Sequence, residues 1–206
     1  MTYEEFGDRN ANTVLIQAVD ANEMKFIEEE VAAIERLSSS SFLFLAAKTE
    51  DWFCDLSPWK APPVFGDRPF GDGAARTLDY ILGICPPDRT CYIGGYSLAG
   101  LFALWAVHQT DAFSGAAAAS PSVWFPGFMD YMKDNRISCG SVYLSLGDRE
   151  EKTRNPVMAS VGRCISEAHD LLVSEGIECT LEYNRGNHFT DPAGRTAAAF
   201  AWLLRH

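Results

Sequence analysis

The chain has 206 residues, of which 47% are apolar, 22% charged and 12% aromatic, as in ordinary globular proteins that build a sizeable core. Its 17 basic and 28 acidic side chains give a formal net charge of −11, which repels phosphate backbones and anionic lipid surfaces. This balance argues against a nucleic acid or a membrane as partner, and the length fits one domain over residues 1–206.

Apolar runs that predict strands alternate along the chain with segments of helical periodicity. In chain order the predicted elements are a strand (13–19), a helix (23–37), a strand (41–47), a helix (74–82), a strand (90–95), a helix (98–108), a strand (114–119), a short helix (128–133), a strand (141–146), a long helix (156–175), a strand (179–183) and a helix (192–204). This alternation predicts an α/β protein with a mostly parallel six-stranded sheet and helices on both faces.

Two longer connections, 49–72 and 120–135, are rich in aromatic residues. Both follow predicted strands, and ligands bind at the carboxyl ends of strands in open α/β sheets. Their aromatic side chains therefore form either the walls of a substrate pocket or a small apolar core that holds the loops down.

The segment Gly-Gly-Tyr-Ser-Leu-Ala-Gly (94–100) joins an apolar strand to an apolar helix. This is the setting of a nucleophile elbow, a strained turn that exposes a serine and needs small residues around it. Ser97 is the candidate nucleophile, with Ala99 at the place of the second motif glycine and Gly100 after it. The backbone N–H of Leu98, at the helix N-terminus, is the candidate oxyanion donor.

Among the four histidines, His188 alone lies in a loop between the last predicted strand and the last helix. A base in such a loop can reach the serine, so His188 is the candidate base. The acid is expected after the preceding strand, where Asp148, Glu150 and Glu151 all compete for the role.

From Phe42 to its end the chain resembles a family of α/β-hydrolase esterases that includes S-formylglutathione hydrolases and siderophore esterases. The resemblance depends on the elbow, on Ala-Ser-Pro-Ser-Val-Trp-Phe (119–125), on Gly-Asp-Arg-Glu-Glu (147–151) and on Gly-Asn-His-Phe (186–189). It implies a three-layer α/β-hydrolase fold, and it favours Glu150 as the acid. The chain departs from the family by lacking the N-terminal antiparallel strands and a His-Gly-Gly oxyanion signature, so the backbone near Asp20 or Ala21 is the candidate second oxyanion donor.

The resemblance implies a serine esterase that cleaves a small-molecule carboxylic ester or thioester through an acyl-enzyme, with Tyr96 and Trp124 contacting the substrate and with no cofactor. Acyl transfer and peptide cleavage by the same residues stay open, as does a ligand-binding protein without catalysis, because a fold does not decide among them.

The termini and the cysteines bear on location. The N-terminus has no apolar stretch of the signal-peptide kind, and no run of about 18 apolar residues predicts a membrane span. The six cysteines are far apart in sequence and include no Cys-x-x-Cys pair: Cys54, Cys85, Cys91, Cys139, Cys164 and Cys179. This spacing favours reduced thiols, no metal site and a cytoplasmic protein.

Overall fold

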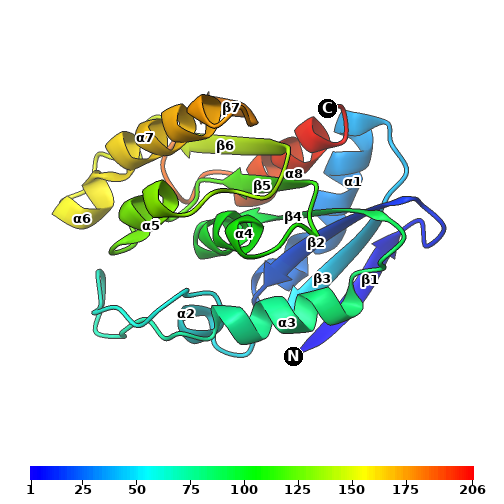
Figure 1. Cartoon of the computed structure of the whole chain (residues 1–206), viewed down its shortest axis with the longest axis horizontal. Coiled ribbons are helices and arrows are strands. Elements are labelled where there is room, and N and C mark those ends of the chain that lie inside the picture. Colours follow the sequence, from blue (N-terminus) through cyan, green and yellow to red (C-terminus); the bar gives the residue numbers. More distant parts are fainter.

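The computed structural model describes residues 1–206 as one twisted sheet with helices on both faces (Figure 1). The strands are β1 (Thr2–Gly7), β2 (Thr13–Val19), β3 (Leu43–Lys48), β4 (Thr90–Tyr96), β5 (Gly115–Ala119), β6 (Ser141–Gly147) and β7 (Glu178–Asn184). The α-helices are α1 (Ile27–Ser38), α2 (Trp52–Asp55), α3 (Ala74–Ile84), α4 (Leu98–Gln109), α5 (Phe128–Asp134), α6 (Pro156–Ala159), α7 (Val161–Ser174) and α8 (Pro192–Leu203), and a 3₁₀ turn, η1 (Glu23–Phe26), precedes α1.

The sheet has seven strands in the order β1-β3-β2-β4-β5-β6-β7, and every pair is parallel except β1 with β3. The predicted α/β class is confirmed. The predicted count of six strands is wrong, and of the antiparallel N-terminal strands that are expected to be lacking, one is present as β1. β1 escapes sequence analysis because it is an edge strand with mostly exposed side chains, so it carries no apolar run.

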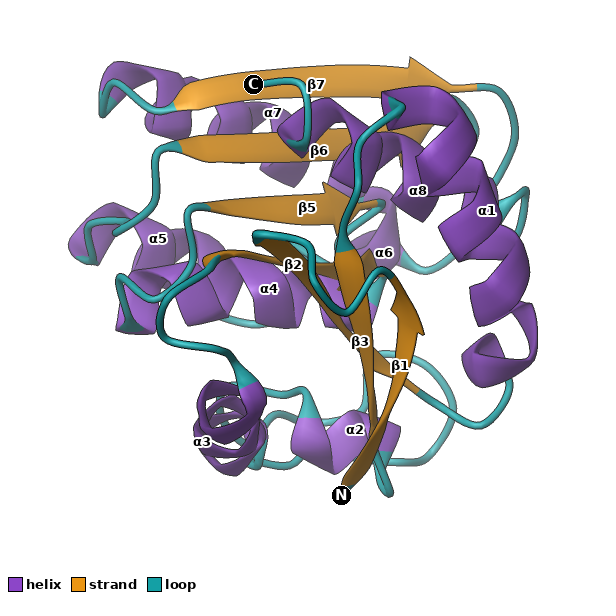
Figure 2. Cartoon of the chain, turned by 90° about the vertical axis from the view of Figure 1, so that its right-hand side faces the viewer, coloured by secondary structure: helices purple, strands orange, loops and turns teal.

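Two apolar cores lie on opposite faces of the sheet, which gives the three layers. One core joins the sheet to α3, α4, α5 and α7, and the other joins it to α1 and α8. Figure 2 shows α1 and α8 together on one side of the strands, with α4, α5 and α7 behind them. No helix is both long enough and apolar enough to cross a membrane.

The long helix predicted over 156–175 is two helices, α6 and α7, with a break at Ser160. The Ser160 hydroxyl donates a hydrogen bond to the Val157 carbonyl at this break. Val157, in α6, is 40% exposed, whereas Val161, Cys164 and Ala168, in α7, are buried.

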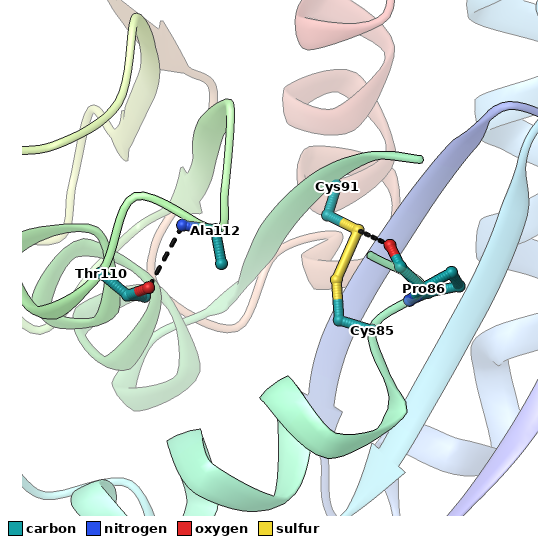
Figure 3. Close-up of a disulfide and its surroundings, with 5 residues drawn as sticks. All are labelled: Cys85, Pro86, Cys91, Thr110 and Ala112. Carbon is teal, nitrogen blue, oxygen red and sulfur yellow. Dashed lines mark hydrogen bonds between the residues drawn. A yellow bond between two sulfur atoms is a disulfide. The ribbon is translucent and has the colours of Figure 1, made fainter. Parts of the chain in front are cut away.

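Cys85 and Cys91 form a disulfide, so the prediction that all six cysteines are reduced is wrong (Figure 3). The bridge joins the end of α3 to the start of β4 across the turn that contains Pro86. The two residues are six positions apart. A search for closely spaced pairs misses them, because it is the proline turn that brings them together.

Candidate active site

Ser97 lies at the tight turn between β4 and α4, with φ 56° and ψ −115°. The turn depends on small neighbours. A Cβ at Gly95 would lie 2.5 Å from the Cβ of Ala99, and one at Gly100 would lie 3.0 Å from the Gly95 carbonyl oxygen. The strand and the helix can therefore approach closely enough to hold Ser97 in this strained conformation.

Three side chains from three separate loops meet at this turn. The Oγ of Ser97 lies 2.9 Å from Nε2 of His188, and Nδ1 of His188 lies 2.7 Å from Oε2 of Glu150. These residues follow β4, β7 and β6 respectively, so the parallel sheet brings all three to one edge. The structure thus joins the three residues that sequence analysis selects as nucleophile, base and favoured acid.

Both carboxylate oxygens of Glu150 take part in hydrogen bonds. While Oε2 faces His188, Oε1 accepts hydrogen bonds from the Gly147 N–H at 2.7 Å, from the Ser120 hydroxyl at 2.8 Å and from Nη1 of Arg195 at 2.8 Å. Burial opposes ionisation, but the contacts with His188, Gly147 and Ser120 outweigh it and lower the pKa of Glu150. Glu150 is therefore a carboxylate at neutral pH.

The two competing acids have other positions. Oδ1 of Asp148 accepts a hydrogen bond from the Gly186 N–H at 2.8 Å, which ties the histidine loop to the end of β6. Glu151 is exposed. Neither side chain is hydrogen-bonded to His188.

Sequence analysis misses Arg195, a buried arginine on α8 whose side chain is 4% exposed. Besides Glu150, it donates to the Ser120 and Tyr96 hydroxyls and to the carbonyls of Arg185 and Asn187. It therefore contacts both the candidate acid, Glu150, and the loop that carries the candidate base, His188. Its one sequence signal is a charged residue within an alanine-rich apolar helix.

Tyr96 also supports the histidine loop. Its hydroxyl donates to the His188 carbonyl at 2.7 Å, and its ring lies 5.1 Å from the imidazole between centroids. Burial raises the pKa of Tyr96 to about 12, so the phenol keeps its proton and acts as a donor.

The two candidate oxyanion donors are backbone groups. Leu98 is the first residue of α4, where an N–H has no partner within the helix. In the β2–η1 turn, the Asp20 N–H donates to Oε2 of Glu23 at 3.2 Å, whereas the Ala21 N–H makes no hydrogen bond within the chain. Of the two residues proposed from sequence, Ala21 is thus the one with a free donor.

Ser97 and His188 open into a cleft of about 890 Å³. Tyr96 and Trp52 line it, but Trp124 is not among its lining residues. Trp124 packs instead against Phe65 and Phe70, at centroid distances of 6.0 and 6.3 Å. Most aromatics of the two long loops form this small core, and Trp52 is the one loop aromatic that reaches the cleft.

No protein-family model matches the chain, and no curated protein matches it. Solved structures do. An IroE-like serine hydrolase from Shewanella oneidensis aligns with a TM-score of 0.77 at 14% identity, over 98% of this chain and 75% of that one. The siderophore hydrolase EstB from Aspergillus nidulans aligns with a TM-score of 0.64 at 18% identity, over 94% of this chain and 82% of that one.

The enterobactin esterase Fes from Shigella flexneri aligns with a TM-score of 0.67 at 14% identity, over 99% of this chain and 56% of that one. This chain thus spans little more than half of that esterase. At sequence identities this low, the similarity is one of backbone fold. The protein has the α/β-hydrolase fold, the fold of these serine hydrolases and siderophore esterases.

Proposed function

We propose that this protein is a serine hydrolase that cleaves a small-molecule carboxylic ester or thioester through an acyl-enzyme. The observation that carries the proposal is the continuous hydrogen-bonded series from Ser97 through His188 to Glu150, at 2.9 and 2.7 Å, beside a cleft. A serine, an imidazole and a carboxylate in this geometry form an activated nucleophile.

In the acylation step, Oγ of Ser97 attacks the ester carbonyl carbon as Nε2 of His188 takes its proton. The carbonyl oxygen becomes an oxyanion, which the N–H groups of Leu98 and Ala21 stabilise. Collapse breaks the bond to the alcohol or thiol, which leaves with the proton from His188. Water then attacks the acyl-enzyme by the same route, releasing the acid and restoring Ser97.

Glu150 does not exchange protons in this scheme. Its carboxylate accepts the hydrogen bond from Nδ1 of His188, which fixes the tautomer with a free Nε2 and stabilises the imidazolium that forms. The low pKa of Glu150 keeps it charged for this role.

Labelling with a fluorophosphonate probe tests the nucleophile. We expect the wild-type protein to be labelled at Ser97 and to hydrolyse a panel of p-nitrophenyl esters and matched thioesters. Ser97→Ala should fold normally, lose the label and lose roughly 10³-fold or more in kcat.

Ser122→Ala is the matched control, because the Ser122 hydroxyl lies 3.3 Å from that of Ser97. It should keep the label. A folded wild-type protein without label or turnover would instead indicate a ligand-binding protein on a hydrolase fold.

A further inference from the structure

The cleft that contains Ser97 has a strongly acidic lining. The lining contains one basic side chain, Arg36, and five carboxyl side chains: Asp20, Glu23, Glu29, Glu30 and Asp191. An excess of carboxyl groups over basic groups favours a positively charged ligand, and such a ligand in turn stabilises the ionised forms of Glu23 and Glu30. The acidic surface of the protein therefore continues into the site where a substrate would bind.

Two polar side chains of this lining, Gln17 and Glu30, are buried, and one oxygen of each has no hydrogen-bond partner within the chain. Gln17 on β2 is 2% exposed and Glu30 on α1 is 4% exposed, and Oε1 of each makes no hydrogen bond. A buried acceptor without a donor costs about 1–3 kcal/mol, and folded proteins seldom retain one. Two such oxygens on the lining of one cleft favour a ligand that carries hydrogen-bond donors.

The pKa values of the carboxyl groups in this region are consistent with a site for a cation. Burial, followed by the proximity of Glu23, raises the pKa of Glu30 well above its usual range, although a hydrogen bond between the Gln17 amide and the Glu30 carboxyl opposes the shift. Burial also raises the pKa of Glu23 to about 8. A positive charge placed between these groups would reverse both shifts.

Aromatic side chains complete the lining. Phe26 is 55% exposed and Phe189 is 85% exposed, and both line the cleft together with Trp52. Aromatic faces attract cations and accept apolar groups. Together with carboxylates, they suit an organic cation with an apolar body. The acidic side chains do not form a set of three or more metal ligands.

We propose that the cleft selects esters that carry a protonated primary amine, which the carboxylates of Glu23 and Glu30 and the amide oxygen of Gln17 bind. An ammonium group has three N–H donors and no acceptor, which matches acceptors that lack donors. This inference rests on the proposed function, because it names the substrate class of the same site.

Two matched ester pairs test it, one for each side of the scissile bond. The first is 4-(aminomethyl)phenyl butyrate against 4-ethylphenyl butyrate, and the second is phenyl 4-(aminomethyl)benzoate against phenyl 4-ethylbenzoate. The members of a pair differ in shape very little but differ by one positive charge. We expect kcat/KM to favour the ammonium member of at least one pair by about 10-fold or more.

Glu30→Gln keeps the shape of the side chain and removes its charge, and it should reduce this preference by about 10-fold. Glu23→Gln should act in the same direction. Glu28→Gln is the matched control, because Glu28 lies on the same helix, is exposed and does not line the cleft. It should leave the preference unchanged.

A preference near one or below one in both pairs, in an enzyme that hydrolyses their neutral members, would overturn the inference and leave the proposed function standing. If no ester is hydrolysed, calorimetry with the Ser97→Ala variant still decides. Binding of the ammonium ester, weakened by Glu30→Gln, supports the inference, and no binding overturns it. It is also overturned if Ca²⁺ or Mg²⁺ binds at Glu30 and the ammonium esters do not compete.

Discussion

At the scale of single residues, Arg195 organises the site without lining the cleft. Its guanidinium pairs with Glu150 at 2.8 Å, with both side chains 4% exposed, and it donates hydrogen bonds to two carbonyls of the loop that contains His188. Removing one partner of a buried ion pair costs about 3–5 kcal/mol, because the other charge is left uncompensated. Arg195 is therefore a positioning residue.

Arg195→Lys should lower kcat by about 10- to 100-fold with little change in KM, because one ammonium cannot replace a planar group with five donors. Arg195→Met should lower kcat further and also destabilise the fold. Steady-state kinetics with a p-nitrophenyl ester and urea denaturation check both variants. A Lys variant with wild-type kcat would show that charge alone is needed.

The three carboxylates after β6 form a matched set. Glu150→Gln should lower kcat by about 10² to 10⁴, since the imidazole loses the charge that orients it. Asp148→Asn should act mainly on stability through its bond to Gly186, and Glu151→Gln should be nearly silent. If Asp148→Asn instead abolishes turnover in a folded protein while Glu150→Gln does not, the two roles are reversed.

Ser97 and His188 can be predicted from local motifs, because an elbow and a loop histidine are recognised from the residues beside them. The family resemblance favours Glu150 over its neighbours. Arg195, Gln17 and Glu30 carry no such local signal, and Trp124, predicted to contact the substrate, lies outside the cleft. Whether a charged or aromatic side chain is buried against a site depends on which distant elements pack together, and no local pattern records that.

At the scale of elements, the strand–turn–helix unit of β4 and α4 carries the strain of the site. Gly95, at φ +157°, and Ala99 face each other so closely that only one of them can have a Cβ. The alanine in place of the second motif glycine is tolerated for this reason. The alternation of strands and helices can be predicted from periodicity. The edge strand β1 cannot, because its side chains are mostly exposed and it is defined by its pairing with β3. The break at Ser160 cannot either, because apolar residues continue at helical spacing on both sides of it.

Gly95→Ala should therefore lower the free energy of unfolding by about 2–3 kcal/mol, as overpacking of a tight site does. Ala99→Gly alone should cost less than about 1 kcal/mol. The double variant should recover part of the Gly95→Ala loss, because the two Cβ atoms no longer meet. Urea denaturation of all four proteins measures this coupling, and strict additivity would contradict the proposed contact.

At the scale of the whole molecule, the fold buries carboxyl groups at the cleft, although burial disfavours their charged form. The parallel strands bring Ser97, Glu150 and His188 to one edge, and β2 and α1 bring Gln17 and Glu30 to the adjoining lining. Burying carboxyl groups there favours their neutral form. The same placement that we propose for binding a cation thus makes the stability of the unliganded protein depend on pH.

The direction of this dependence follows from linkage. Below about pH 4.5, Glu23 and Glu30 bind protons in both the folded and the unfolded chain, so their burial has no effect through titration. As the pH rises, the unfolded chain releases these protons while the folded chain keeps them, up to a pKa of about 8 for Glu23. The free energy of unfolding should therefore fall between about pH 5 and pH 9.

Glu30→Gln replaces one of these titrating groups with a neutral amide. It should therefore remove the part of the decrease in unfolding free energy that comes from Glu30. We expect the variant to match the wild type at pH 5 and to exceed its free energy of unfolding at pH 9, because the folded wild type alone keeps the Glu30 proton there. Glu28→Gln, which is exposed, should change neither value appreciably. Urea denaturation at the two pH values measures the difference. A Glu30→Gln protein less stable than the wild type at pH 9 would show that Glu30 supports the fold as a paired carboxylate. A more stable variant would show that the native Glu30 lowers the stability of the unliganded protein.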